Sequence, residues 1–521
     1  MAENLASPVG QAHARRLFVG SCVALTASSM MFALMADVIP ALKEQFILTN
    51  EQIGWIRGTG WGFTLAIILL GPLCDALGMR SIIALAFACH TAGALLLVFA
   101  GGFWTLFAGG ALHAFGAGSI EAACNPLIAT IYPQSKTEKL NQFHMWFPGG
   151  IVIGGLLAYL FTKLGLGWQW KLALVLPPTA AYALLFIGEK FPPTERVQAG
   201  VSGGEMVRES LSRPLFLVLL FCMMLTASLE LGPMGWVSPV LEAGGVPGIL
   251  VLVWITGLMA VLRYFAGPIV NTLGNINTLL LSAVVAGAGL VCLSFAGGSA
   301  FTAGAAATVF ALGVCYFWPT MLGTAAERVP RGGAMALAML GGIGGLFVNL
   351  VTTPQMGRIA DKYLHRELVR KVTVDGRTID RQQETVAVLQ AVDGAYADWI
   401  ASLGDSRLDK LRAAEAGAAR RQIQQVLKKF QETGSLPEPD TANALRAAIG
   451  NGPRGDAATA SGALRSAIEA RDRAAGILNP AENKGGLISF RYVAPLSIVL
   501  ILIFGAIRIR DMRAASAQTK P

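Results

Sequence analysis

Long apolar segments, each close to the length that crosses a bilayer as a helix, recur along most of the chain. About 20 apolar residues are enough for an α-helix to span the hydrocarbon core. We expect spanning helices at about 17–39, 52–75, 81–100, 103–132, 141–163, 169–188, 214–241, 247–270, 276–296, 299–326, 332–357 and 488–507. The pattern predicts an all-α membrane protein with twelve transmembrane helices and both termini on one side.

A polar segment, 362–486, interrupts this pattern between the eleventh and twelfth apolar runs. Apolar residues recur at helical spacing in 406–431, and 385–403, 441–449 and 459–478 also have helical patterns. An Asp-Gly turn between β-branched residues predicts a small hairpin at 372–379. The alternative is a disordered insertion, but disordered segments lack such apolar stripes. We expect a mainly helical inserted domain that lies outside the cytoplasm.

Two sequence motifs occur twice. The stretch GPLCDALG, Gly71–Gly78, returns as GPIVNTLG, Gly267–Gly274, and Pro126 with the glycines that follow it is echoed by Pro319 at nearly the same offset. A shared offset predicts a duplicated chain of two six-helix bundles with a site between them. The expected units are an N-terminal bundle (1–188), a cytoplasmic linker (189–213), helices 7 to 11 of the C-terminal bundle (214–361), the inserted domain (362–486), and helix 12 with a cytoplasmic tail (487–521).

Composition and charge agree with a membrane protein. The chain has 54% hydrophobic and 14% charged residues, against about 25% charged residues in soluble proteins. Its seven cysteines all lie in apolar runs, so no disulfide framework is indicated. Basic residues gather in alternate short loops, which predicts cytoplasmic termini. Because no short cleavable segment precedes the first run, we read that run as a spanning helix in a bacterial inner membrane. The inner basic residues are Arg15, Arg16, Arg80, Lys136, Lys139, Lys190, Arg196, Arg208, Arg213, Arg328, Arg331, Arg508, Arg510 and Arg513.

Two acids lie inside the apolar runs. Glu121 is followed closely by Asn125 and Pro126 in the run 103–132. An ionised carboxylate at the bilayer centre costs about 3 kcal/mol, so such residues usually bind a proton or a polar ligand. Glu230 precedes a Gly-Pro pair, and interrupted helices in transporters line cavities; the alternative is an acid at the outer helix end. Arg263 is expected to lie near the inner surface and to extend its charge into water.

Several function classes are not supported. The sequence has no GxxxxGK[ST] phosphate loop and no His/Cys cluster with metal spacing, so we expect no enzyme, no cofactor and no metal site. The expected partners are a small solute, protons and the lipid bilayer, with no nucleic acid. An extracytoplasmic partner of 362–486 is a further expectation.

The stretch Gly71–Arg80 resembles the loop between helices 2 and 3 in the major facilitator superfamily. The resemblance implies that this loop gates the conformational change, and the expected gating residues are Gly71, Asp75, Gly78, Arg80 and, in the second copy, Asn271. Asp75 and Arg80 are expected to pair at the inner surface.

A narrower resemblance connects four motifs with the fucose/galactose/glucose:proton symporter family. These four are Ala36–Pro40, Glu121–Pro126, Leu140–His144 and Trp318–Thr320, and the stretches Phe46–Gly54 and Thr353–Gly357, ending in Asp361, fit the same family. The resemblance covers all twelve expected spans but not 362–486. In that family an acid on helix 1 and an acid on helix 4 handle the proton and contact the sugar. By motif these are Asp37 and Glu121. Their alternatives are a solvated helix-end acid and a structural acid.

The resemblance implies substrate contacts by Glu121, Asn125, Asn141 and His144. Glu230 is added because its helix is interrupted, and Trp61 and Trp318 because sugar sites commonly stack the ring on an aromatic face. The family has glutamine where His144 stands and asparagine where Phe147 stands, so the exact sugar stays open. We expect a proton-coupled symporter of a sugar or related polar solute. The alternatives are a facilitator or exporter of another small organic solute, and a membrane receptor or scaffold that acts through 362–486.

Overall fold

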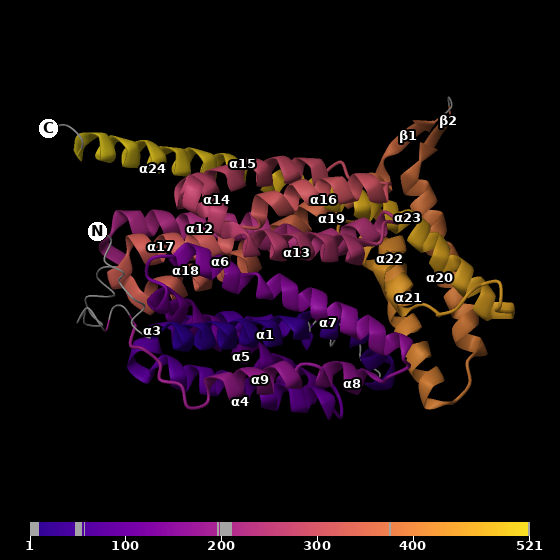
Figure 1. Ribbon diagram of the computed structural model, residues 1–521. Coiled ribbons are helices and arrows are strands. Elements are labelled where there is room, and N and C mark those ends of the chain that lie inside the picture. Colours follow the sequence, from indigo (N-terminus) through magenta and orange to yellow (C-terminus); the bar gives the residue numbers. More distant parts are fainter. Residues whose placement is uncertain are drawn as a thin grey trace.

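The computed structural model describes residues 10–46, 55–56, 58–194, 197, 211–374 and 377–518. Two bundles of long helices lie against each other, and the start of α1 and the end of α24 lie at the same end of the molecule (Figure 1). A third group of helices lies across the opposite end. The first expected loop, most of the expected linker and the hairpin turn lie outside the described residues.

The first bundle contains the helices before residue 190. Their bounds are α1 (Gln11–Phe46), η1 (Gly58–Gly60), α3 (Trp61–Leu77), α4 (Met79–Val98), α5 (Phe103–Ile131), α6 (Lys136–His144), α7 (Trp146–Lys163), α8 (Trp168–Ala173) and α9 (Leu176–Phe186).

The second bundle begins after the linker and is closed by the last helix of the chain. Its elements are α12 (Pro214–Ala243), α13 (Gly248–Tyr264), α14 (Ala266–Leu273), α15 (Asn275–Leu293), α16 (Ala300–Val314), α17 (Phe317–Arg328), η2 (Pro330–Gly332), α18 (Gly333–Phe347), η3 (Val348–Thr352), α19 (Thr353–Val369) and α24 (Leu496–Gln518).

Within the described residues, eight helices are long and apolar enough to cross a membrane, and nine if α13 and α14, which are bent by 61°, form one span. Three expected spans, 52–75, 103–132 and 169–188, are not among these long apolar helices. In 52–75 the described apolar helix covers only Trp61–Cys74, and 169–188 is divided into α8 and α9. Helix α5 is 29 residues long but rich in glycine, and Gly116–Ile131 is buried throughout. A helix enclosed by other helices does not need an apolar surface for lipid.

The duplicated motif has the same backbone shape in both copies. Its last residue is Gly78 between α3 and α4, with φ +79°, and Gly274 between α14 and α15, with φ +78°. Glycine reaches this left-handed region without the steric cost that a Cβ atom brings. The repeated glycine therefore makes the same sharp connection in each bundle.

Residues 364–481 contribute to a second hydrophobic core that is separate from the core of the bundles. It contains α20 (Arg381–Ser402), α21 (Arg407–Thr433), α22 (Asp440–Asn451) and the first part of α23 (Gly462–Val493), together with the end of α19. The expected helices and hairpin are confirmed: β1 (Lys371–Val374) pairs antiparallel with β2 (Arg377–Asp380), and Val372 lies opposite Ile379.

Two continuous helices connect the second core to the bundles. The expected boundary at 361/362 lies inside α19, and the one at 486/487 lies inside α23. Asn483 on α23 donates a hydrogen bond to the carbonyl of Val240 on α12. On the side of the second core, Arg446 bridges Asp361 and Glu482. Burial lowers the pKa of this guanidinium, but its hydrogen bonds to the two carboxylates outweigh burial and raise the pKa above its usual value.

Candidate functional site

Glu121 lies in the buried part of α5, between the two bundles. Helix α5 contacts α1, α3, α4 and α6 of the first bundle and α17 and α18 of the second. Asn125, one helical turn further, donates its Nδ2–H to Glu121 Oε2 at 2.6 Å. Both side chains are buried, so the amide supplies a partner that water cannot supply here.

His144 completes a cluster of three side chains in the first bundle. Its Nε2 lies 2.9 Å from Asn125 Oδ1, and its Nδ1 lies 3.7 Å from Glu121 Oε1. Since the Asn125 amide nitrogen faces the carboxylate, its oxygen accepts, and His144 therefore donates from Nε2. The amide of Asn125 holds the acid and the imidazole side by side.

An ion pair from the second bundle lies next to this cluster. Glu230 is in the middle of α12, and Arg263 is near the end of α13. Arg263 Nη2 lies 2.7 Å from Glu230 Oε1, and each side chain is only 3% to 4% exposed. The expectation that Arg263 extends into water at the inner surface is wrong. The alternative reading of Glu230 as an outer helix-end acid is also wrong, because Glu230 is buried in mid-helix.

Arg263 also binds two backbone carbonyls, and each lies where a helix is interrupted. Its Nε donates to Cys315 O at 2.6 Å, between α16 and α17, and its Nη1 donates to His144 O at 3.1 Å, between α6 and α7. Four residues after each carbonyl stands a proline, Pro319 and Pro148, which has no N–H to offer. In a bilayer every backbone polar group must find a partner inside the protein. Arg263 supplies both partners, and its bond to His144 joins the two bundles.

Asn141, on α6, is fully buried and faces the second bundle. Its Nδ2 donates to Thr137 O and to Thr320 Oγ1. Among the described residues, its Oδ1 has no hydrogen-bond partner. A buried acceptor without a donor is rare in native proteins and suits a polar ligand or an ordered water.

The remaining expected site residues lie apart from this cluster or at its edge. Asp37, on α1, pairs with Lys171 at 2.6 Å, and the described residues show no hydrogen bond or ion pair between Asp37 and Glu121. Trp61 is half exposed at the start of α3. Trp318 is buried in α17, close to Gly341 and Gly344 of α18.

The two bundles are also joined at the end where α1 begins and α24 ends (Figure 1). Within the part of the chain that the structure describes, six hydrogen bonds connect α6 with the second bundle, including those of Asn141 and His144. Thr137 donates to Glu327 Oε1 at 2.7 Å, and Asn275 donates to Glu327 Oε2 at 2.7 Å. Asn271, expected as a gating residue, donates to Glu138 Oε2 at 3.2 Å.

The first copy of the duplicated motif, Gly71–Gly78, also contacts the second bundle. A Cβ atom on Gly71 would overlap the methyl group of Ala338 on α18, so the absence of a side chain lets α3 and α18 touch. Arg80 is exposed. The Asp75 side chain lies outside the described residues, so its pair with Arg80 stays a prediction.

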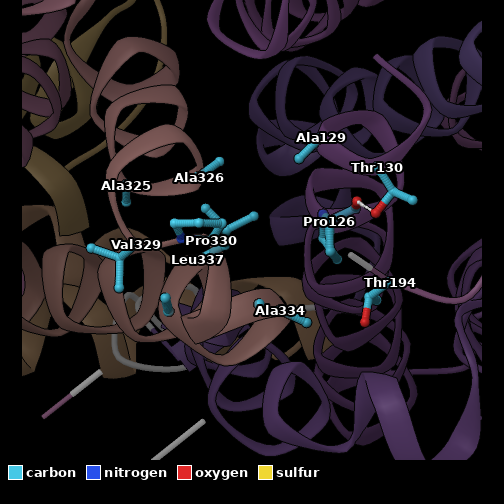
Figure 2. A pocket seen from close by; sticks show the side chains of 12 residues that line it. Pro126, Ala129, Thr130, Thr194, Ala325, Ala326, Val329, Pro330, Ala334 and Leu337 are labelled. Carbon is cyan, nitrogen blue, oxygen red and sulfur yellow. Dashed lines mark hydrogen bonds between the residues drawn. The ribbon is translucent and has the colours of Figure 1, made fainter. Parts of the chain in front are cut away.

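A small cavity lies between the bundles and begins on α5 directly after Asn125. Figure 2 shows it between α5, which contributes Pro126, Ala129 and Thr130, and α17 with α18. Its volume of about 20 Å³ is enough for about one water molecule. Thr130 Oγ1 donates to the carbonyl of Pro126 at its wall. This end of the interface is therefore closed in the present conformation.

Sequence reasoning gave Arg263 a different role and missed the contacts of Thr320, Thr137, Asn275 and Glu327. A lone arginine in an apolar run that also has a partner acid in the preceding run was a usable signal for Arg263. The other contacts join separate helices, and their residue types are ordinary. Within the described ranges, no group of three or more His, Cys, Asp or Glu side chains could hold a metal ion.

Comparisons with known proteins agree with this architecture. The sequence profile of the Major Facilitator Superfamily matches residues 17–349. A D-xylose transporter of Levilactobacillus brevis is 27% identical over 156 residues, which are 30% of this chain and 34% of that protein.

Solved structures show the same fold at low sequence identity. A Major Facilitator Superfamily transporter, FucP, in the outward conformation is 18% identical with a TM-score of 0.55, covering 66% of this chain and 92% of that chain. The proton:xylose symporter XylE is 14% identical with a TM-score of 0.57, covering 69% and 91%. The human organic anion transporter MFSD10 is 13% identical with a TM-score of 0.52, covering 66% and 93%. The family match spans well over half of the sequence, and the chain belongs to the Major Facilitator Superfamily of membrane transporters.

Proposed function

We propose that the chain is a proton-coupled symporter of a sugar or a related polar solute. The observation that carries the proposal is the buried Glu121–Asn125–His144 cluster at the interface of the bundles, beside the unpaired acceptor of Asn141. A carboxylate and amides of this kind bind sugar hydroxyls, and a buried carboxylate also exchanges a proton. The likeness to FucP and XylE and to a D-xylose transporter supports a sugar as the solute.

In this proposal Glu121 binds the proton and the solute, with Asn125, Asn141 and His144 as further solute contacts. Glu230 and Trp318 complete the site from the second bundle, and Trp61 lies at its outer approach. Asp37, near the outer end of α1, is the second proton-coupling carboxylate and acts on the same proton as Glu121. Gly71, Asp75, Gly78, Arg80 and Asn271 control the closure of the inner end.

Proteoliposomes test this function. We expect the purified chain to accumulate D-xylose or fucose when the lumen is alkaline, and Glu121→Gln to abolish accumulation while solute exchange without a gradient persists. A side chain that cannot release a proton cannot transmit the gradient. The control is Asp511→Asn, which changes an acid in the tail helix α24. Undiminished accumulation by Glu121→Gln would remove the assigned role.

A second candidate is a transporter of small organic anions. Arg263 is a buried guanidinium at the interface, and guanidinium groups bind carboxylates with two parallel hydrogen bonds. MFSD10 has the same fold. However, Arg263 is already bound to Glu230 and two carbonyls, so the sugar proposal has more support. Stabilisation of the purified protein by sugar acids and not by sugars would favour the second candidate.

We further propose twelve spans, cytoplasmic termini, a bacterial inner membrane and an extracytoplasmic domain at 362–486. Asp405, which is fully exposed, and Ala514, exposed in α24, report on the two sides. A membrane-impermeant thiol reagent on intact cells is expected to label Asp405→Cys and to leave Ala514→Cys unlabelled until the cells are opened. The opposite labelling would invert the orientation. Binding of a partner by 362–486 in a variant that transports nothing would support a receptor instead.

A further inference from the structure

The buried charges around Glu121 do not balance when all of them are ionised. Lys136, a further buried cation at the interface, lies at the start of α6, about 12 Å along the helix from His144, where it donates to Ala326 O. Glu121 and Glu230 contribute two negative charges, and Arg263 contributes one positive charge. An uncompensated charge in a low-dielectric interior is costly, and the cost is usually avoided by taking up or releasing a proton. One added proton makes the cluster neutral.

Geometry indicates where this proton resides. Arg263 lies directly on Glu230, so that carboxylate is already compensated. Between Glu121 Oε1 and His144 Nδ1, 3.7 Å apart, two acceptors face each other, because His144 donates from its other nitrogen to Asn125. Two facing acceptors repel unless one of them holds a hydrogen. On His144 the hydrogen would create a second buried cation beside Arg263, which binds the His144 carbonyl, whereas on Glu121 it leaves both groups neutral. The added proton therefore belongs on Glu121.

Neighbouring titratable groups leave this charge count unchanged. Cys124 faces Glu121 from α5, and Cys315 and Tyr316 face Arg263 from the break between α16 and α17. Thiols and phenols are neutral at physiological pH. The ion pair of Asp37 with Lys171 is neutral as a unit and has other contacts.

We propose that Glu230 and Arg263 form a charge-balancing positioning pair that reserves a single exchangeable proton for Glu121 and sets the coupling at one proton per solute molecule. Both residues of the pair belong to the second bundle, and the hydrogen bond from Arg263 to His144 O connects the pair to the first bundle. The coupling ratio rests on the proposed symport. The number of protons that the cluster binds in the absence of solute does not.

Infrared spectroscopy of the purified full-length protein in an ester-free detergent tests the count. The carbonyl stretch of a protonated carboxyl group that shifts in D₂O is compared between variants at neutral pH. We expect one such buried group in the wild type and none in Glu121→Gln. Glu230→Gln should also show none, because the freed Arg263 then holds Glu121 ionised. Arg263→Gln should show two, and the double variant Glu230→Gln/Arg263→Gln should show one.

If the pair only stabilised the fold, the number of protonated carboxyl groups would not change from variant to variant in this way. An unchanged count in Arg263→Gln, or a retained signal in Glu230→Gln, would overturn the proposal. Arg263→Lys keeps the charge and must keep one signal; two signals there would contradict it as well. Size-exclusion profiles check folding, and if Arg263→Gln fails that check, Glu230→Gln decides alone.

Transport measurements separate this inference from the proposed function. With D-xylose and fucose as probes, the ratio of proton-driven accumulation to gradient-free exchange corrects for any loss of the Glu230 solute contact. Glu230→Gln and Arg263→Gln should each lower this ratio at least tenfold, and the double variant should regain it. A double variant no better than the single variants, in protein that still exchanges solute, would overturn the coupling role. If the wild type accumulates neither probe, the proposed sugar transport fails, and the infrared count still tests the pair.

Discussion

Arg263 is a single side chain that completes the hydrogen bonding of two helices that prolines interrupt. Its guanidinium has five donors in a fixed fork, which suits one carboxylate and two carbonyls at once. Lysine could replace the charge but not this geometry. At the residue scale, the site therefore depends on the shape of Arg263 as much as on its charge.

The pair of Asp37 and Lys171 allows a prediction about asymmetric burial. The Lys171 side chain is 11% exposed and that of Asp37 is 34% exposed. Asp37→Ala leaves a buried cation with one hydroxyl partner, Thr162 Oγ1, at a cost of about 1–3 kcal/mol. Lys171→Met leaves a hydrated carboxylate and should cost less than about 1 kcal/mol. Thermal unfolding in detergent measures both, and an equal loss in the two variants would contradict this explanation.

Glu121 and Asn125 could be predicted from the sequence, because a carboxylate inside an apolar run needs a reason to be there. The position of Arg263 could not be predicted in the same way. Its acceptors belong to His144 and Cys315, and only the approach of three separate helices brings them together. Distances within one helix follow from its period, whereas distances between helices depend on packing.

At the scale of elements, helix interruptions gather around the site. Helices α6 and α7 break at Met145, α13 and α14 at Phe265, and α16 and α17 at Cys315–Tyr316. The sequence predicted the runs but not these breaks, since apolar periodicity continues across them. Interrupted helices in transporters free backbone groups where they line a site. Here a side chain, Arg263, binds two of the freed carbonyls.

Helix contact at the inner end allows a second prediction. In Gly71→Ala the new methyl group would overlap that of Ala338, so α3 and α18 must separate. Contacts of small residues set how closely two helices approach. We expect a thiol reagent to label Ala129→Cys, in the wall of the closed cavity, several-fold faster when Gly71→Ala is also present.

A matched glycine provides the control. Gly155 on α7 has no atom within 4 Å of an added Cβ, so Gly155→Ala should leave the labelling rate of Ala129→Cys unchanged. Equal rates with Gly71→Ala and Gly155→Ala would show that the α3–α18 contact does not hold the inner end closed.

At the scale of the whole molecule, two cores share the chain. The core of the bundles includes Leu487, Phe490 and Val493 of α23, and the second core includes Ala467 to Ala481 of the same helix. The helical pattern of 362–486 predicted the elements of the second core. It could not predict that α19 and α23 run uninterrupted between the cores, because the change from polar to apolar residues indicates a boundary in sequence, not a break in backbone.

A deletion tests whether the second core takes part in transport. Gly485 faces Ala360 and Leu364, so an antiparallel pairing places the end of α19 beside about residue 478 of α23. Replacing 371–477 by a short Gly-Ser linker keeps the contacts of Asn483 and Gly486 with α12. Since separate cores fold as separate units, we expect accumulation of D-xylose or fucose within about twofold of the full chain.

Loss of accumulation by a deletion protein that folds would make the second core part of the transport path. Deletion of 366–484 is the contrasting case, because it also removes Asn483 and thereby its bond to Val240. That longer deletion should unfold at lower temperature than the shorter one.

Because α23 runs uninterrupted from the second bundle into the second core, a rotation of that bundle displaces the far end of the helix. Helix α23 has 32 residues, a length of about 48 Å at 1.5 Å per residue. If the second bundle turns as a rigid body by about 10°, the far end of such a rod sweeps through about 8 Å. A fluorescent dye at Ser466, exposed near the far end of α23, read against a second dye on the first bundle, would therefore report each turn of the transport cycle without any label in the path of the solute.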